Sequence, residues 1–272
     1  MLLGLIVACA APEPERFTKV SAGTGHACGL LTTGEATCWG GEGYRETDPP
    51  LGEFIDLAAG GDQTCGIRPT GAIECWGLNE YGQATPPSGP FVSVAAGEKF
   101  ACALDAAGEA TCWGYLQGVP PYATALSSLS AGEADACGVT AEGGAVCWGH
   151  ESYGDMTGPY GPFVAVDVAA EVVCTLNEAG ALWCWGCEAN ADYGSCTLPE
   201  DETYAVVEGG AFHTCGLTTS GQIVCAGCGD DGYMDQDRGQ CDAPEGSFVG
   251  LSSGAYQACA LDSDGGVTCW GE

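Results

Sequence analysis

Cysteine recurs in this chain as seven pairs, and the two members of each pair are ten positions apart. The pairs are Cys28 with Cys38, Cys65 with Cys75, Cys102 with Cys112, Cys137 with Cys147, Cys174 with Cys184, Cys215 with Cys225 and Cys259 with Cys269. Successive first cysteines are 35 to 44 residues apart, so one repeated unit builds almost the whole chain. Repeats of this length that carry strand signals are typical of propellers and solenoids, in which each unit packs on its neighbours.

Each unit predicts three short strands. The first is an apolar run such as residues 91–96, which lies between Pro90 and Gly97 and has the pattern of a buried strand. An aromatic residue or leucine begins this run in every unit, eleven positions before the first cysteine. A strand that recurs in register with the cysteines indicates a shared framework.

The second and third strands predict a hairpin that carries both cysteines. In the first unit, residues 26–31 and 35–40 flank a turn at Gly34, because glycine adopts the positive φ that a short loop needs. Cys28 then lies opposite Cys38, close enough for a cross-strand disulfide. The same spacing predicts one such disulfide in each of the seven units. In the chain-entropy model each bond contributes about 2.5 to 3 kcal/mol.

The aligned units share more than their cysteines. Glycine stands five positions before the first cysteine in six units and six positions after it in all seven, and the second cysteine begins Cys-Trp-Gly in six. Glycine-rich loops such as residues 78–83 follow. This pattern resembles the regulator of chromosome condensation repeat over residues 17–272. The resemblance implies an all-β, seven-bladed propeller and leaves function open, because the family includes a nucleotide exchange factor, partner-binding modules and a secreted β-lactamase inhibitor.

The net charge of the chain limits which classes of partner it can bind. The chain has 6 lysine and arginine residues against 37 aspartate and glutamate residues, a net charge of −31. Such a surface repels the phosphate backbone of nucleic acids. We therefore expect a monomer that binds a protein partner, one with a basic surface, and no nucleic acid.

The remaining cysteines predict an exported protein. Cys187–Cys196 and Cys228–Cys241 form two further predicted disulfides inside long loops, which fits an oxidising compartment. Only Cys9 is left, and the preceding apolar run, too short to span a bilayer, resembles a bacterial lipobox. We expect residues 1–9 to be a signal and lipidation segment and residues 10–16 a tether; an ordinary cleaved signal peptide is the alternative. The predicted location is the bacterial cell envelope or the exterior.

Candidate binding residues are found where the units differ. Two positions before the first cysteine, the units carry His26, Phe100, Asp135 and His213 among others. A framework role is the simpler interpretation of the histidines, since a metal site would need His26 and His213 to meet at one end of the channel. No acid, base and nucleophile set recurs, and no resident cofactor is expected.

Two loop features complete the candidate set. Tyrosine recurs near the loop glycine at Tyr44, Tyr81, Tyr153, Tyr193 and Tyr233, which predicts aromatic anchors on one end of the propeller; packing of each ring under its own loop is the alternative. Carboxylates at Asp230, Asp231, Asp235 and Asp237 are a candidate calcium loop, and a solvated acidic loop is the simpler interpretation.

The sequence therefore predicts an exported, lipid-anchored binding module without catalytic activity. Its rigid disc would present loop side chains to an envelope or extracellular protein. A secreted enzyme inhibitor of the same fold is the alternative, and a hydrolase that uses the central channel is the third hypothesis.

Overall fold

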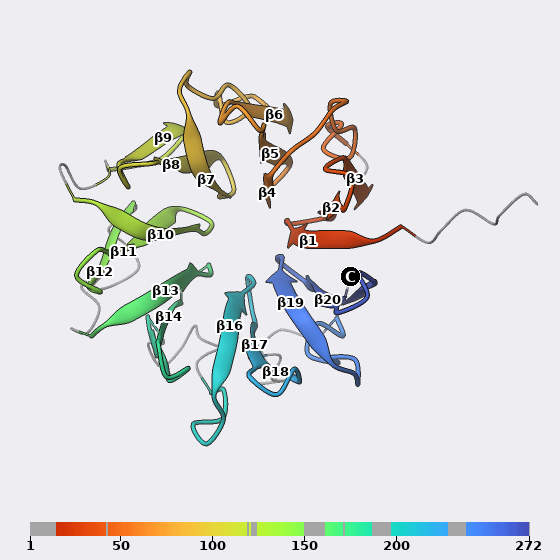
Figure 1. Cartoon of the computed structure of the whole chain (residues 1–272), viewed down its shortest axis with the longest axis vertical. Helices are drawn as coiled ribbons and strands as arrows, with labels where there is room; N and C mark the ends of the chain where they lie inside the picture. Colours follow the sequence, from red (N-terminus) through yellow and green to blue (C-terminus); the bar gives the residue numbers. More distant parts are fainter. Residues whose placement is uncertain are drawn as a thin grey trace, which may run out of the picture.

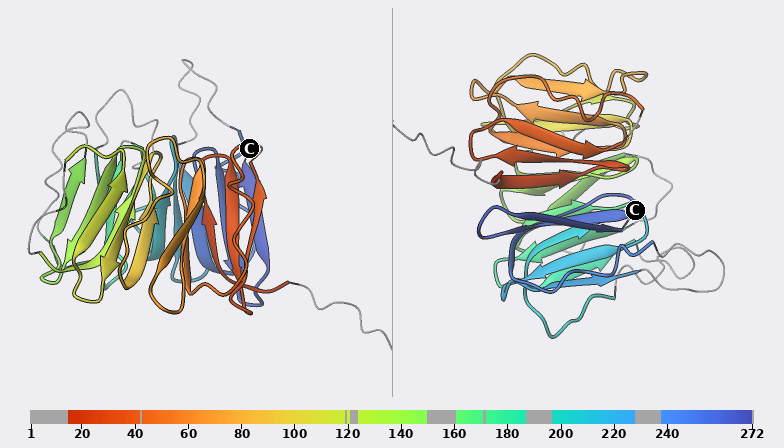
Figure 2. Two further views of the ribbon diagram at one scale, coloured as in Figure 1. Left: turned by 90° about the horizontal axis from the view of Figure 1, so that it is seen from above. Right: turned by 90° about the vertical axis from the view of Figure 1, so that its right-hand side faces the viewer.

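The chain folds as a ring of seven three-stranded antiparallel sheets in a computed structural model (Figures 1 and 2). The structure describes residues 15–41, 43–118, 120, 124–149, 161–170, 172–186, 197–227 and 238–271. Over these residues there is no helix long and apolar enough to cross a membrane. The predicted seven-bladed, all-β propeller is confirmed.

Within each sheet, or blade, the three strands follow one another in chain order, from the channel to the rim (Figure 1). The inner strands are β1 (Phe17–Ala22), β4 (Asp56–Ala59), β7 (Phe91–Ala96), β10 (Leu126–Ala131), β13 (Phe163–Val168), β16 (Tyr204–Gly209) and β19 (Phe248–Ser253). The middle strands are β2 (His26–Leu31), β5 (Gln63–Ile67), β8 (Phe100–Asp105), β11 (Asp135–Thr140), β14 (Val173–Asn177), β17 (Thr214–Thr218) and β20 (Gln257–Asp262). The outer strands are β3 (Ala36–Gly40), β6 (Ile73–Gly77), β9 (Ala110–Gly114), β12 (Ala145–Gly149), β15 (Leu182–Trp185), β18 (Ile223–Ala226) and β21 (Val267–Gly271).

The hairpin and its disulfide form as predicted in every blade. Gly34 adopts a φ of 85° in the first turn, and its amide donates to the carbonyl of Leu31. The paired Cα atoms are 4.0 to 4.1 Å apart in all seven bonds. The confirmed bonds join Cys28 to Cys38, Cys65 to Cys75, Cys102 to Cys112, Cys137 to Cys147, Cys174 to Cys184, Cys215 to Cys225 and Cys259 to Cys269.

The two cysteines of each bond differ in burial. The first cysteine lies on the middle strand and is buried in every blade. The second lies on the outer strand and is less buried: Cys38, Cys75, Cys112, Cys147, Cys184 and Cys225 are half-buried, and Cys269 is exposed. Each bond therefore connects the rim of a blade to its buried middle strand.

The two predicted loop disulfides lie largely outside the described residues. Cys187, Cys196 and Cys228 all fall there. Cys241 is described, and it is disulfide-bonded.

The hydrophobic core is divided among the interfaces between blades. In one cluster Leu30 of the first blade packs with Phe54, Leu57 and Trp76 of the second, and the buried Cys28 belongs to the same cluster. The recurring phenylalanines and tryptophans therefore hold neighbouring blades together. Each blade buries its apolar surface on the next, as expected for a repeat architecture.

A β-bulge sets which side chains face the channel in six of the seven inner strands. In the first blade the register shifts between Phe17 and Lys19, so Thr18 is the extra residue. The same shift occurs in five other blades. A bulge interrupts the alternation of side chains between the two faces of a strand. Phe17 and Val20 therefore both belong to the core, while Ser21 lines the channel.

A ring of glycines lets the inner strands approach closely. Alanine at Gly97 would place its Cβ 2.5 Å from the carbonyl oxygen of Gly132 in the next blade, and alanine at Gly132 would do the same to Ala169. The same clash with the next blade recurs at Gly23, Gly60, Gly210 and Gly254. Glycine recurs here because only hydrogen fits between adjacent backbones.

The fifth blade breaks this glycine pattern, and the sixth blade compensates for it. Ala169 takes the place of the ring glycine, and the position before the sixth ring glycine is Gly209 where four other blades carry alanine. A Cβ at Gly209 would overlap the Cβ of Ala169. The methyl group of Ala169 therefore occupies space that Gly209 leaves free.

The ring closes without exchange of a strand. β1 belongs to the first blade and β19 to the last, and the two lie side by side (Figure 1). The Phe17 amide donates to the carbonyl of Gly265 in the last hairpin turn at 2.9 Å, as the Phe54 amide does to Gly34 at 2.7 Å. The closing interface thus uses the same contacts as the others.

The disc has two different faces. One, here called the hairpin face, carries the turns between middle and outer strands and receives the chain at Phe17. The other, here called the loop face, carries the turns between inner and middle strands together with the loops that join one blade to the next. Hydrogen bonds from Gly41 to Gly25 and from Leu78 to Asp62 hold the start of these loops against those turns.

Candidate functional site

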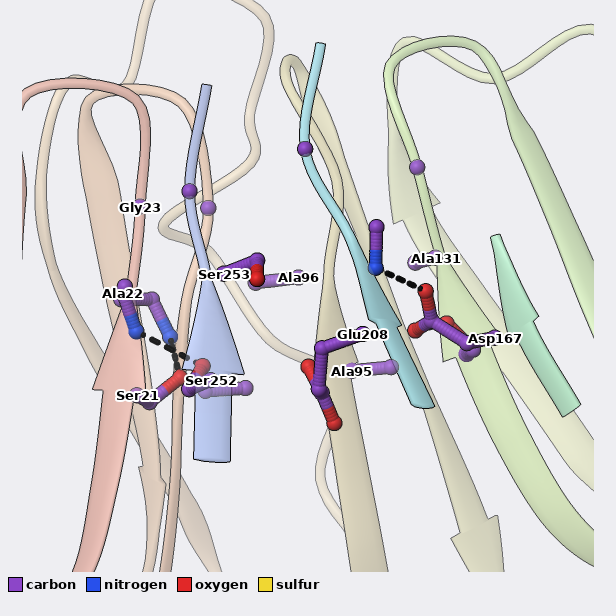
Figure 3. A pocket seen from close by; sticks show the side chains of 18 of the residues that line it. Ser21, Ala22, Gly23, Ala95, Ala96, Ala131, Asp167, Glu208, Ser252 and Ser253 are labelled. Atoms are coloured by element: carbon purple, nitrogen blue, oxygen red, sulfur yellow. Dashed lines mark hydrogen bonds between the residues drawn. The ribbon is translucent and has the colours of Figure 1, made fainter. Parts of the chain in front are cut away.

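The seven inner strands surround a cavity of about 680 Å³ along the propeller axis (Figure 3). Most of its wall consists of small residues, among them Ala58, Ala95 and Ser252. Small side chains leave the channel open, whereas larger ones would fill it. The few polar groups on this wall therefore determine what can bind.

Five of these polar groups share one position, seven residues before the first cysteine. Its side chain accepts the backbone amide of the next blade: Ser252 from Ala22 at 3.0 Å, and Ser21 from Ala59 at 2.9 Å. Ser130 accepts similarly from Val168 at 3.1 Å. Three serines therefore link successive blades around the channel.

In the fifth and sixth blades this position carries acids. Asp167 accepts the Gly209 amide at 2.7 Å and the hydroxyl of Ser130 at 3.1 Å. Burial raises the pKa of Asp167 to about 6. Burial also raises the pKa of Glu208, and the neighbouring charge of Asp167 raises it further. Two carboxylates in adjacent blades thus share a poorly solvated wall, where ionising both is costly.

The other charged groups of the channel lie toward its two ends. Lys19 forms an ion pair with Asp56 of the second blade. The positive charge of Lys19 partly offsets the rise in the pKa of Glu208. Glu98 and Glu133 lie at the end next to the loop face. The channel therefore has more negative than positive groups.

The predicted framework position, two before the first cysteine, connects neighbouring blades. The Gln63 amide donates to the carbonyls of Gly97 and Phe100 at 2.8 and 3.2 Å, and Gln257 donates to the carbonyl of His26 at 2.9 Å. His26 Nε2 is 2.7 Å from the hydroxyl of Thr64 in the second blade. These side chains are structural links.

His213 holds the same position in the sixth blade, but neither of its ring nitrogens has a hydrogen-bond partner among the described residues. The residue that corresponds to Thr64 in the next blade is Ala258, which offers no hydroxyl. Burial lowers the pKa of His213 to about 4. His213 is therefore a neutral, unsatisfied side chain between two blades.

Replacing His213 by glutamine should stabilise the protein. Glutamine at this position donates to the next blade in the second and seventh blades, so we expect a gain of about 1 kcal/mol at pH 7. The pKa of His213 is about 4 in the folded protein and 6.5 in the unfolded chain. The unfolded chain therefore takes up the proton first, and the protein loses stability as pH falls from 6.5 toward 4. The advantage of His213→Gln should thus grow by about 2 kcal/mol at pH 5. Urea unfolding of both proteins at the two pH values tests this, and a gain independent of pH would contradict it.

The tyrosines of the loop face are exposed on loops whose backbone is held in place. Tyr44 is 51% exposed and Tyr81 is 46% exposed. The buried Glu46 accepts the Tyr44 amide, and the buried Gln83 accepts the Tyr81 amide at 2.8 Å. The carbonyls of Glu46 and Gln83 in turn accept Trp76 and Trp113 of the following blade, each at 2.8 Å. The Cys-Trp-Gly tryptophan thus anchors the loop that presents each tyrosine.

Sequence reasoning missed further aromatic residues on this face. Tyr115, 58% exposed, lies beside Tyr81 with 5.6 Å between ring centroids. Phe212 and Tyr256 form a second pair at 5.3 Å, and Arg238 lies over the Tyr256 ring. The signal was available, because Phe212 and Tyr256 stand at one repeat position, three before the first cysteine.

None of the other predicted site residues that the structure describes lies on the surface. His26, Phe100, Asp135 and His213 are all buried at blade interfaces, so they present no surface to a partner. The further tyrosines, the lipidation residue and the acidic candidates lie outside the described residues: Tyr153, Tyr193, Tyr233, Cys9, Asp230, Asp231, Asp235 and Asp237. Within the described part of the chain, no group of three or more His, Cys, Asp or Glu residues is arranged to hold a metal ion.

A family model identifies the repeat. The model described as the regulator of chromosome condensation (RCC1) repeat matches residues 17–45 and 206–232, within the first and sixth units. Two of the seven units therefore match the RCC1 repeat. No curated protein matches the chain.

Solved structures similar to this propeller include two from plants and one from yeast. The CRINKLY WD40 ectodomain of the Arabidopsis thaliana receptor kinase ACR4 is 25% identical with a TM-score of 0.77, and the match covers 93% of each chain. The ectodomain of the Physcomitrella patens receptor kinase CR4 is 24% identical with a TM-score of 0.78, covering 94% of this chain and 74% of that one. Prp20p of Saccharomyces cerevisiae is 15% identical with a TM-score of 0.66, covering 80% and 72%.

Proposed function

We propose that this chain is an exported, lipid-anchored module that binds a basic protein partner through its loop face and catalyses no reaction. The proposal rests on the exposed tyrosines, which lie on loops held in place by buried hydrogen bonds. An aromatic ring on a fixed backbone loses little conformational entropy on binding, so it makes an efficient anchor. Tyr44, Tyr81 and Tyr115 provide three such rings in adjacent blades.

The solved relatives support an interaction role and an extracellular location. Two of them are ectodomains of receptor kinases, and Prp20p is described by its binding to Gsp1p and histones. Seven disulfides favour an oxidising compartment for this chain as well. The net charge of −31 favours a basic partner and a salt-sensitive association.

The point where the chain enters the disc fits anchoring at Cys9. Phe17 begins β1 on the hairpin face, bonded to the turn at Gly265. A tether that precedes Phe17 would leave from the face opposite the tyrosines. The loop face would then point away from the membrane and remain open to a partner.

Substitution of the three tyrosines should weaken partner capture. We expect Tyr44→Ala, Tyr81→Ala and Tyr115→Ala together to weaken binding at least tenfold, since buried aromatic anchors each contribute about 1 to 2 kcal/mol or more. The test is affinity capture from the envelope fraction of the source organism with residues 15–272 as bait, at low and high salt. The matched control replaces Val92, Val164 and Val249, exposed residues at the start of inner strands on the hairpin face, by alanine. Equal capture by parent and both variants would overturn the assignment of the loop face.

A further inference from the structure

Asp167 and Glu208 carry charges that the framework of the propeller does not need. Their position in the repeat is occupied by serine in the first, fourth and seventh blades, and those serines accept the amide of the next blade equally well. Figure 3 shows both acidic side chains on the channel wall, on neighbouring strands. Each carboxylate therefore costs desolvation free energy without a structural reason.

A third polar group faces the same space without a partner. Ser253 of β19 is 9% exposed, and its hydroxyl has no hydrogen-bond partner among the described residues. In Figure 3 its side chain points from β19 into the channel, above Glu208. The backbone amide of Ser253 is bonded to the Glu208 carboxylate. A buried hydroxyl left unsatisfied beside two carboxylates marks a place for a ligand that donates hydrogen bonds.

The surroundings of this group favour a positively charged ligand. Of the other charged residues that line the channel, Lys19 is paired with Asp56, and Glu98 and Glu133 add negative charge at the loop-face end. The protein as a whole adds a net charge of −31. A channel lined by one sign of charge concentrates ions of the opposite sign. At about 680 Å³ the cavity has room for a small organic molecule.

We propose that the central channel binds a small organic cation through a primary ammonium group held by Asp167, Glu208 and Ser253. An ammonium group has three donors and no acceptor, and these three side chains offer three acceptors. Glu208 lies between the other two, next to Asp167 in the blade before it and Ser253 in the blade after it. This site is separate from the loop face and does not depend on the proposed protein partner.

Calorimetric titration with 1,5-diaminopentane tests the proposal. The parent protein should bind it in 150 mM NaCl at pH 7, and Asp167→Ser with Glu208→Ser should weaken binding at least tenfold. Serine is the residue that three other blades carry here, so this variant keeps the bond between blades. The control variant, Glu109→Ser with Glu178→Ser, removes the same two charges from exposed hairpin turns and should bind as the parent does.

A second measurement does not require a folded variant. Because the pKa of Asp167 is about 6, a cation bound there should displace a proton near pH 6. The apparent binding enthalpy should then differ between phosphate and MES, whose ionisation enthalpies differ. The fully N-methylated diamine, 1,5-bis(trimethylammonium)pentane, has the same two charges and no N–H donor, and it should bind at least tenfold more weakly than the diamine.

Several results would overturn the proposal. These are no binding to the parent, equal binding by the Asp167→Ser, Glu208→Ser variant, equal binding of 1,5-bis(trimethylammonium)pentane, or an enthalpy independent of buffer. Binding of Ca²⁺ alone at this site would also overturn it, because a metal ion would then be the ligand.

Discussion

Full reduction of the seven hairpin disulfides should unfold the propeller at neutral pH without denaturant. Each bond closes a short loop and contributes about 2.5 to 3 kcal/mol in the chain-entropy model. Loss of all seven removes about 20 kcal/mol, which exceeds the roughly 5 to 15 kcal/mol that keeps a typical domain folded. The first cysteine of every pair is buried between blades, so the effect reaches every interface.

Removal of a single disulfide complements the full reduction. Circular dichroism and tryptophan fluorescence before and after reduction report the global effect. Cys102→Ala with Cys112→Ala removes one bond and leaves six, and it should lower the free energy of unfolding by about 2.5 to 3 kcal/mol. Retention of a cooperative unfolding transition at the parental urea concentration after full reduction would show that packing between blades is sufficient.

Alanine at Gly254 should weaken the interface that closes the ring. Its Cβ would overlap the carbonyl oxygen of Gly23, and a backbone atom cannot move aside as a side chain can. Overpacking of this kind costs about 3 kcal/mol at its upper end. The protein as a whole should be less stable, and the contact between the last and the first blade should also open more often. Urea unfolding measures the first effect, and faster hydrogen exchange in β1 and β19 measures the second.

Two controls isolate the close approach as the cause. Gly25 follows Gly23 by two residues, and a Cβ there meets no atom within 4 Å, so Gly25→Ala should change stability by less than about 1 kcal/mol. Gly209→Ala should be destabilising alone and should recover when Ala169→Gly is added, because the two methyl groups compete for one space. If Gly254→Ala behaves like Gly25→Ala, the glycine ring is not required for closure.

The local parts of the fold could be predicted from the sequence because the repeat displays them seven times. The hairpin turn at Gly34 and the pairing of Cys28 with Cys38 depend only on residues close together in the chain, and both are confirmed. The aromatic residue that recurs eleven positions before the first cysteine indicated a shared framework, and Phe54 at this position packs between two blades. Seven aligned copies make such regularities hard to mistake.

The channel site could not be predicted in the same way. If side chains alternated strictly from the half-buried Phe17, which packs on the core, Ser21 would face the core, and the bulge at Thr18 reverses that assignment. The bulge depends on pairing with the middle strand, which the inner-strand sequence does not reveal. Asp167 and Glu208 are 41 residues apart and meet only because blades pack side by side. The same holds for Tyr81 and Tyr115, which come from different loops.

The absence of strand exchange at the closing interface bears on how such a molecule can arise. Each repeat in the sequence corresponds to one whole blade, with its own inner, middle and outer strand and its own disulfide. A gene duplication that copies one repeat therefore adds a complete blade, and a deletion removes one, without leaving half a sheet at either end. Ancestors with fewer blades, and relatives whose chain begins at a different blade, are both accessible through single genetic events.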